Sequence, residues 1–182
     1  MCFTHIGIWY NQSMITRRDV LCSAAALLVL PPTLSASYAE AIEVLKEPYQ
    51  TIAVVHRDLF PGSTTVPSPR LLKALDYLAG VMKDPYVDED EKAFLKNGAR
   101  WLNEQAKEEF GSAYYLLDAS QRQRVLHTVA GLTWGDNWLW NLFSYLFEAL
   151  LCDPVYGANT HEAGWHWLDY EPGYPRPKAP FI

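Results

Sequence analysis

The stretch WLWNLFSYLFEALL (Trp138–Leu151) decides the fold class of this chain. Its polar residues Asn141, Ser144 and Glu148 are spaced three and four positions apart, which places them in one narrow stripe of an α-helix. The rest of the helix circumference is apolar, which is typical of a helix buried inside a helical domain. We therefore expect one helix over Asp136–Leu151, packed against several others.

Upstream of this helix, the residues 68–82 carry the signals of another one. Ser68 is a good N-cap, Pro69 would occupy the first helical position, and apolar residues follow at helical spacing until Asp84-Pro85. The segment Tyr49–Phe60 has a β-branched centre and could be a short strand or an irregular helix.

Two more helices are predicted by their first residues. Asp88 opens one, in which the following acidic residues lie near the positive end of the helix dipole and which ends at Phe110-Gly111. Asp118 and Gln121 have the spacing of a capping box and predict a helix that ends near Gly131.

Beyond residue 152 the chain becomes rich in Pro, Gly and aromatic residues and loses its periodicity. The expected fold class is therefore mostly α. It consists of a compact domain of about four helices over residues 40–152 and a long, irregular C-terminal arm over residues 153–182.

The first 39 residues have the features of an export signal. Arg17-Arg18 precede a short apolar run and small residues, and adjacent arginines favour the twin-arginine route, which accepts folded cargo. Met14 is a plausible true start, and cleavage after Ala39 or after Ala41 both fit a small-x-small site. The apolar run is too short to span a bilayer.

Charge and cysteine content exclude several functions. The formal net charge is −6, which disfavours nucleic acid and anionic membranes as partners. Removal of the signal leaves Cys152 as the only cysteine, so the mature chain cannot ligate an iron–sulfur cluster. This thiol is either buried or bridged to a partner chain. The chain has no GxGxxG, P-loop or CxxCH motif.

A few polar residues are candidates for chemistry. His161 and His166 are five positions apart, so they do not share a helix face as the histidines of HExxH do, although a loop could bring them and Asp169 to a metal ion. His56, with Arg57 and Asp58 beside it, is expected to lie in a solvated polar turn, and His127 is expected to be a core or surface residue and not a catalytic base. Glu148 lies in an apolar helix and requires a hydrogen-bonding or ionic partner.

The segment LLCDPVYGAN (Leu150–Asn159), followed by Gly164-Trp165, resembles the DPxYGGN…GW signature of the gluconate 2-dehydrogenase subunit 3 family. The stretch from Phe94 to Asn103, the pair Phe110-Gly111 and the stretch from Gln121 to Leu126 also look like the central helices of that family. One departure is Ala158, where a second Gly is usual.

The resemblance implies a trimeric, periplasmic enzyme that is associated with the inner membrane. In such a complex an FAD-containing large subunit of the GMC type oxidises a sugar or polyol, and a multihaem cytochrome c subunit accepts the electrons. The small subunit provides the signal for the twin-arginine (Tat) translocase and is needed for maturation of the flavoprotein. We thus expect no catalytic residue, cofactor or metal ion in this chain, and substrate choice would reside in the partner.

Contacts with the partner are expected from the central helix and from the arm. In the arm, Asp153 would cap the chain turn, Pro154 would fix its direction, and Gly157 would permit a tight turn. The same signature could instead be a turn that folds the arm onto its own domain. A free-standing periplasmic sugar-binding module is the alternative function. The candidate contact residues are Trp138, Phe143, Glu148, Asp153, Pro154, Tyr156, Gly157, Asn159, Gly164 and Trp165.

Overall fold

The computed structural model describes residues 45–180. Their fold is mostly α, as predicted, and these residues contain no strand. The predicted export signal, with Arg17 and Arg18, lies outside the described residues. The α-helices are α3 (Tyr49–Leu59), α4 (Ala74–Val81), α5 (Glu89–Phe110), α6 (Ala119–Ala130), α7 (Thr133–Leu151) and α8 (Ala163–Leu168). Three short 3₁₀ helices are η1 (Tyr114–Leu116), η2 (Pro154–Tyr156) and η3 (Thr160–Glu162).

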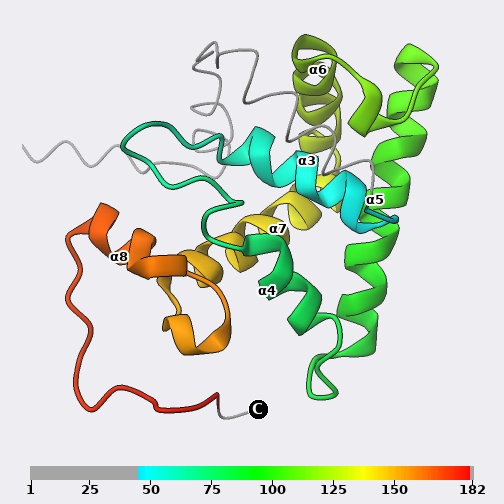
Figure 1. Cartoon of the computed structure of the whole chain (residues 1–182). Helices are drawn as coiled ribbons and strands as arrows, with labels where there is room; N and C mark the ends of the chain where they lie inside the picture. The colour runs from blue at the N-terminus through cyan, green and yellow to red at the C-terminus, as the bar shows by residue number, and fades with distance from the viewer. Residues whose placement is uncertain (1–44, 181–182) are drawn as a thin grey trace, which may run out of the picture.

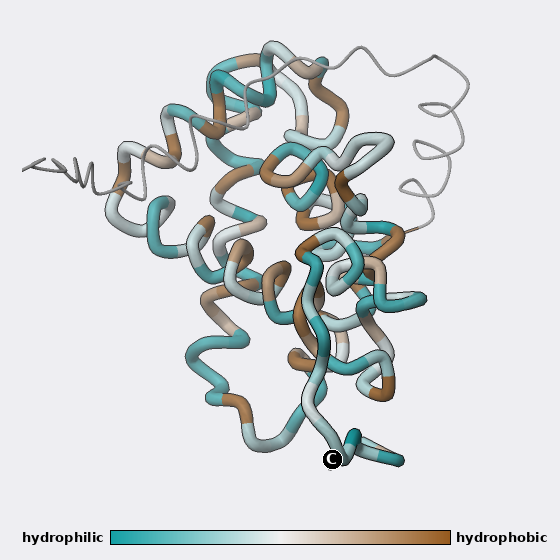
Figure 2. The backbone as a smooth tube through the Cα atoms, turned by 90° about the vertical axis from the view of Figure 1, so that its left-hand side faces the viewer, coloured by the Kyte–Doolittle hydropathy of each residue, from teal (hydrophilic) through white to brown (hydrophobic). Residues whose placement is uncertain are grey.

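Helix α7 is the centre of the domain. It packs against α3, α4, α5, α6 and α8, and in Figure 1 it runs from the neighbourhood of α6 to that of α8. Trp138 and Leu142 on its inner side are fully buried. In Figure 2, hydrophobic and hydrophilic positions alternate along the helices, as expected for elements that bury one face.

Trp138 also sets how closely α5 and α7 approach each other. Its indole Nε1 donates a hydrogen bond to the Leu95 carbonyl at 3.0 Å. A Cβ at Gly98 would lie 2.2 Å from the indole, so glycine is required where the ring crosses α5. Trp138 is therefore a core residue of this chain.

The helix ends predicted from capping residues are confirmed. Asp88 accepts a hydrogen bond from the Asp90 amide at 2.7 Å, and Asp118 forms a complete capping box with Gln121. Gly111 ends α5 in the left-handed region, at φ 72°. Of the two alternatives for Tyr49–Phe60, the structure has the helix, α3. The solvated turn expected at His56 is wrong, because His56 lies within α3 and is 1% exposed.

The predicted helix start at Pro69 is wrong, because residues 69–73 form turns and α4 begins only at Ala74. Ser68 does accept a hydrogen bond from the Leu71 amide, at 3.3 Å. Lys73 then adopts a left-handed conformation, at φ 53°, and interrupts the helix. The reason is tertiary: the Leu72 carbonyl accepts a hydrogen bond from the distant Asn159 amide at 3.0 Å.

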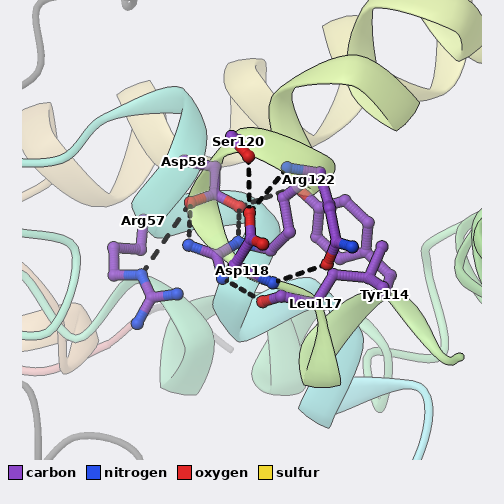
Figure 3. A network of polar contacts seen from close by, with 8 residues as sticks. Arg57, Asp58, Tyr114, Leu117, Asp118, Ser120 and Arg122 are labelled. Carbon is purple, nitrogen blue, oxygen red and sulfur yellow. Dashed lines mark hydrogen bonds and ion pairs between the residues drawn. The ribbon is translucent and has the colours of Figure 1, made fainter. Parts of the chain in front are cut away.

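A buried ionic network joins α3, η1 and α6 (Figure 3). Arg122 donates to both carboxylate oxygens of Asp58, at 2.7 and 3.2 Å, and to the Leu117 carbonyl at 2.7 Å. The Tyr114 hydroxyl also donates to Asp58, at 2.7 Å. Burial, followed by the neighbouring Asp58 carboxylate, raises the pKa of Tyr114. The network connects α3 to η1 and α6, which follow each other closely but lie 56 to 64 residues away from Asp58.

Beyond α7 the chain turns back on the domain. The helices η2, η3 and α8 follow one another, and α8 packs against α7 (Figure 1). From residue 170 to residue 180 the chain has no helix. None of the helices within residues 45–180 is both long and apolar enough to cross a bilayer.

Candidate functional site

The signature region begins with a tight turn at the carboxyl end of α7. Asp153 Oδ1 accepts a hydrogen bond from the Val155 amide at 3.0 Å and caps η2, in which Pro154 occupies the first position. Gly157 ends η2 at φ 87°, in the left-handed region that glycine adopts without strain. The local roles predicted for Asp153, Pro154 and Gly157 are thus confirmed.

Asn159 joins three parts of the chain. It is fully buried, and its backbone amide donates to the Leu72 carbonyl before α4. Its side-chain Nδ2 donates to the Cys152 carbonyl at 3.0 Å, while Oδ1 accepts from the Gly164 amide at 2.7 Å. Asn159 is also in the left-handed region, at φ 48°, which asparagine tolerates better than most residues. This one residue, through its backbone amide and its side chain, therefore links the segment before α4 to the end of α7 and to α8.

Gly164 and Trp165 lie where α8 meets α7. A Cβ at Gly164 would come within 2.1 Å of the Leu150 carbonyl oxygen, so the two backbones are in direct contact. The Trp165 indole donates to the Leu151 carbonyl at 2.8 Å, and Trp165 is only 4% exposed. The indole hydrogen bond satisfies one of the carbonyl groups that the end of α7 leaves free.

The structure accommodates Ala158, which stands where the family signature usually has a second glycine. It is 2% exposed and packs in a small cluster with Ala74, Leu146 and Ala149. Its φ is not among the positive values of the described residues, so an L-residue fits without backbone strain.

Arg176 links the chain beyond residue 170, which we call the tail, to the signature region. Its guanidinium donates to Asp153 at 2.9 Å and to Glu162 at 2.6 Å, and its Cζ lies 4.9 Å from the centroid of a Trp165 ring. The hydrogen bond from Arg176 is the largest cause that lowers the pKa of Asp153. The tail is thereby held against the signature region.

The two polar or reactive side chains near the end of α7 are Glu148 and Cys152. The Tyr77 hydroxyl of α4 donates to Glu148 at 3.0 Å, which provides the partner expected for this carboxylate. Burial and then Glu148 raise the pKa of Tyr77. Cys152 is half-buried, and burial raises the pKa of its thiol, so the thiol is protonated at neutral pH.

The three candidate metal ligands, His161, His166 and Asp169, are all exposed. Within residues 45–180, no group of three or more His, Cys, Asp and Glu side chains is placed to hold a metal ion.

The candidate contact residues thus fall into two groups. Trp138, Asn159, Gly164 and Trp165 are buried by the chain itself, whereas Phe143 is partly exposed and Glu148 is exposed. Asp153, Pro154 and Tyr156 are partly exposed, and Gly157 is exposed. Whether any of them contacts a partner stays a prediction.

Sequence reasoning missed three side chains on the outer face of α7. Trp140, Phe147 and Leu151 lie on the same face as Phe143, and Trp140 and Leu151 are 38% and 46% exposed. Their spacing of three or four residues was a usable signal, because such positions share one helix face. It was hidden because α7 is apolar on its inner face as well.

Residues 45–180 form an α-helical domain in which the signature turn links the end of α7 to α8 and to the segment before α4. A family comparison matches residues 46–173 to "Gluconate 2-dehydrogenase subunit 3". This match covers most of the chain, so the protein belongs to the gluconate 2-dehydrogenase subunit 3 family, as the signature predicted. Comparisons with curated proteins and with solved structures gave no match.

Proposed function

We propose that this chain is the non-catalytic small subunit of a periplasmic, FAD-dependent dehydrogenase of the gluconate 2-dehydrogenase type. The single observation that carries the proposal is the family match over residues 46–173, which include the signature turn and every helix of the domain. A subunit of such an enzyme acts through its partners. The FAD-containing large subunit oxidises the sugar, and a multihaem cytochrome c subunit takes the electrons.

The role that we assign to this chain is export and maturation of the flavoprotein. Arg17-Arg18 and the apolar run that follows are typical of a twin-arginine signal, which serves cargo that is already folded. Flavin is bound in the cytoplasm, so a flavoprotein without a signal requires a companion with one. The domain would bind the large subunit before transport, and the complex would reach the periplasmic face of the inner membrane.

The proposal is tested by following the flavoprotein. Cells that express the subunits receive either the pair of changes Arg17→Lys and Arg18→Lys or, as a control, Arg100→Lys on the exposed side of α5. With the signal changed, the flavoprotein should remain in the cytoplasm, whereas the control should export it normally. Export that is unchanged by the loss of both arginines would contradict the role in transport.

A second measurement tests the assembly itself. The tagged wild-type chain is purified from the periplasm, and mass spectrometry of the co-purifying proteins should find an FAD-containing dehydrogenase and a cytochrome c. The isolated chain should oxidise no sugar with a dye acceptor. Turnover by the isolated chain would overturn the proposal.

A further inference from the structure

The outer face of α7 carries a continuous apolar strip, which we call the aromatic row: Trp140, Phe143, Phe147 and Leu151. The ring centroids of Trp140 and Phe143 are 6.1 Å apart, and those of Phe143 and Phe147 are 4.8 Å apart. Leu151 extends the row by one turn to the place where Trp165 of α8 meets α7. The row lies on a different side of α7 from the core residues Trp138, Leu142 and Leu146, so α7 is apolar over more of its circumference than the core uses.

The part of the sequence that contains the row is acidic. From Val125 to Pro175 the sequence contains no Lys or Arg, so neither α7 nor α8 carries a basic residue other than histidine. The same stretch holds six carboxylates: Asp136, Glu148, Asp153, Glu162, Asp169 and Glu171. Arg176, the next cation along the chain, is bound to two of them, Asp153 and Glu162. Most of the other basic residues lie on α3 to α6 and the segments that connect them.

This charge distribution selects the kind of occupant. Two copies of the chain that met through the row would bring acidic surroundings together, and like charges oppose such a contact. An anionic membrane is disfavoured for the same reason. An apolar depression with Lys and Arg at its rim would accept the rings and neutralise the carboxylates.

We propose that the aromatic row is the docking surface for the flavoprotein subunit, which would meet it with an apolar depression rimmed by Lys and Arg. This inference rests on the proposed function, in which the flavoprotein is the partner that must stay bound throughout transport. Large aromatic side chains are the residues that most often dominate the binding energy of an interface. The hydrogen bonds of the Asn159 side chain keep α8 against the end of the row and thereby fix the shape of this surface.

A photo-crosslinking amino acid tests the location of the docking surface without disturbing the core. It is introduced at position 140 in one variant and at position 86 in the other. Position 86 is the control, because Tyr86 is 90% exposed and belongs to the segment between α4 and α5. Both variants are co-expressed with the flavoprotein. Position 140 should crosslink to the flavoprotein and position 86 should not. Equal crosslinking at both positions, or crosslinking at position 86 alone, would overturn the proposal.

The energetic test uses the double variant Trp140→Ser and Phe147→Ser, with Tyr86→Ser as the matched control. Loss of two central aromatic anchors should weaken binding to the flavoprotein by about 30-fold or more, and the control by less than about threefold. Thermal unfolding of each free variant is measured alongside, since the row is outside the core. Wild-type affinity in a folded double variant would overturn the proposal.

The acidic surroundings predict a further result. A carbodiimide, which joins carboxylates directly to amines, should link Asp136, Asp169 or Glu171 to lysines of the flavoprotein, and added salt should weaken the complex. If the wild-type chain forms a homodimer that the double variant lacks, a second copy is the occupant and the proposal is wrong. If the wild-type chain binds no flavoprotein at all, the proposed function itself is wrong. If it binds the flavoprotein and the row variants bind equally well, only the proposed docking surface is wrong.

Discussion

Different interactions stabilise the helical domain, α3–α7, and the C-terminal segment, residues 153–180. The domain buries a large set of apolar side chains around α7, among them Trp138, Leu102 and Leu139. The segment buries few side chains and relies on hydrogen bonds from Asn159 and Trp165 to backbone carbonyls and on close backbone contact at Gly164. Stability is thus distributed over many contacts in the domain and concentrated in a few residues of the segment.

The largest effect is expected in the core of the domain. Trp138→Ala removes a fully buried ring and its hydrogen bond to Leu95, so the free energy of unfolding should fall by about 4 kcal/mol. Trp140→Ala on the outer face of the same helix should cost less than about 1 kcal/mol. Urea denaturation of the free chain measures the loss of stability in each variant. Similar losses would contradict the distinction between a core side and an outer side of α7.

The ionic network is the next test of the domain. Asp58→Ala leaves Arg122 buried without its anion, so a loss of about 3 kcal/mol is expected. Glu104→Ala removes the exposed partner of Arg100 and should cost less than about 0.5 kcal/mol. Chemical denaturation at neutral pH compares the two variants. An equal effect would mean that burial of the Asp58 pair is energetically irrelevant.

Acid should weaken the domain through His56. Its imidazole is buried, neither ring nitrogen has a hydrogen-bond partner among the described residues, and burial lowers its pKa from 6.5 to about 4. Above pH 6.5 both states are neutral at this residue. As the pH falls from 6.5 to 4, the unfolded chain takes up a proton that the folded chain excludes, so stability falls by about 3 kcal/mol in total.

The variant His56→Leu isolates this contribution. It keeps an apolar side chain of similar size and cannot bind a proton, so the decline of stability between pH 6.5 and 4 should become shallower than in the wild type. Unfolding midpoints across this range measure the slope. Identical slopes in the two proteins would contradict the assignment.

A smaller and more local effect is expected in the segment. Asn159→Ala removes two side-chain hydrogen bonds and leaves alanine in a left-handed conformation, so the local stability of η3 and α8 should fall by about 2 kcal/mol. Hydrogen exchange should accelerate in residues 153–168 and stay unchanged in α5. Asn159→Asp, which retains the acceptor for Gly164, should lie between the wild type and Asn159→Ala. Exchange that rises equally in α5 would show that the two regions unfold together.

The smallest change is expected at the tail. Arg176→Ala removes the links to Asp153 and Glu162 and should expose residues beyond 170 to proteases while η2 and α8 remain in place. Lys178→Ala, two residues further on at an exposed position, is the control and should leave cleavage unchanged. Equal cleavage of the two variants would contradict a role for Arg176 in holding the tail.

The difference between the two regions also explains which features could be predicted. Capping residues and apolar spacing act within a few residues of one another, so Asp88, Asp118 and the periodicity of α5 to α7 indicated helices directly. The core role of Trp138 and the outer position of Trp140 could not be separated, because both belong to a helix that is apolar on two sides. Which side faces the core depends on Gly98, a residue of another helix.

The sequence by itself determined the helical class, the helix ends marked by caps and the family, since each depends on a pattern that is local in the chain. The tertiary structure alone decided that residues 69–73 form turns before α4 and that the Leu72 carbonyl accepts a hydrogen bond from the distant Asn159 amide. It alone also decided that Arg176 returns to Asp153 and Glu162. Such contacts join residues far apart in sequence, and their geometry exists only after the helices have packed.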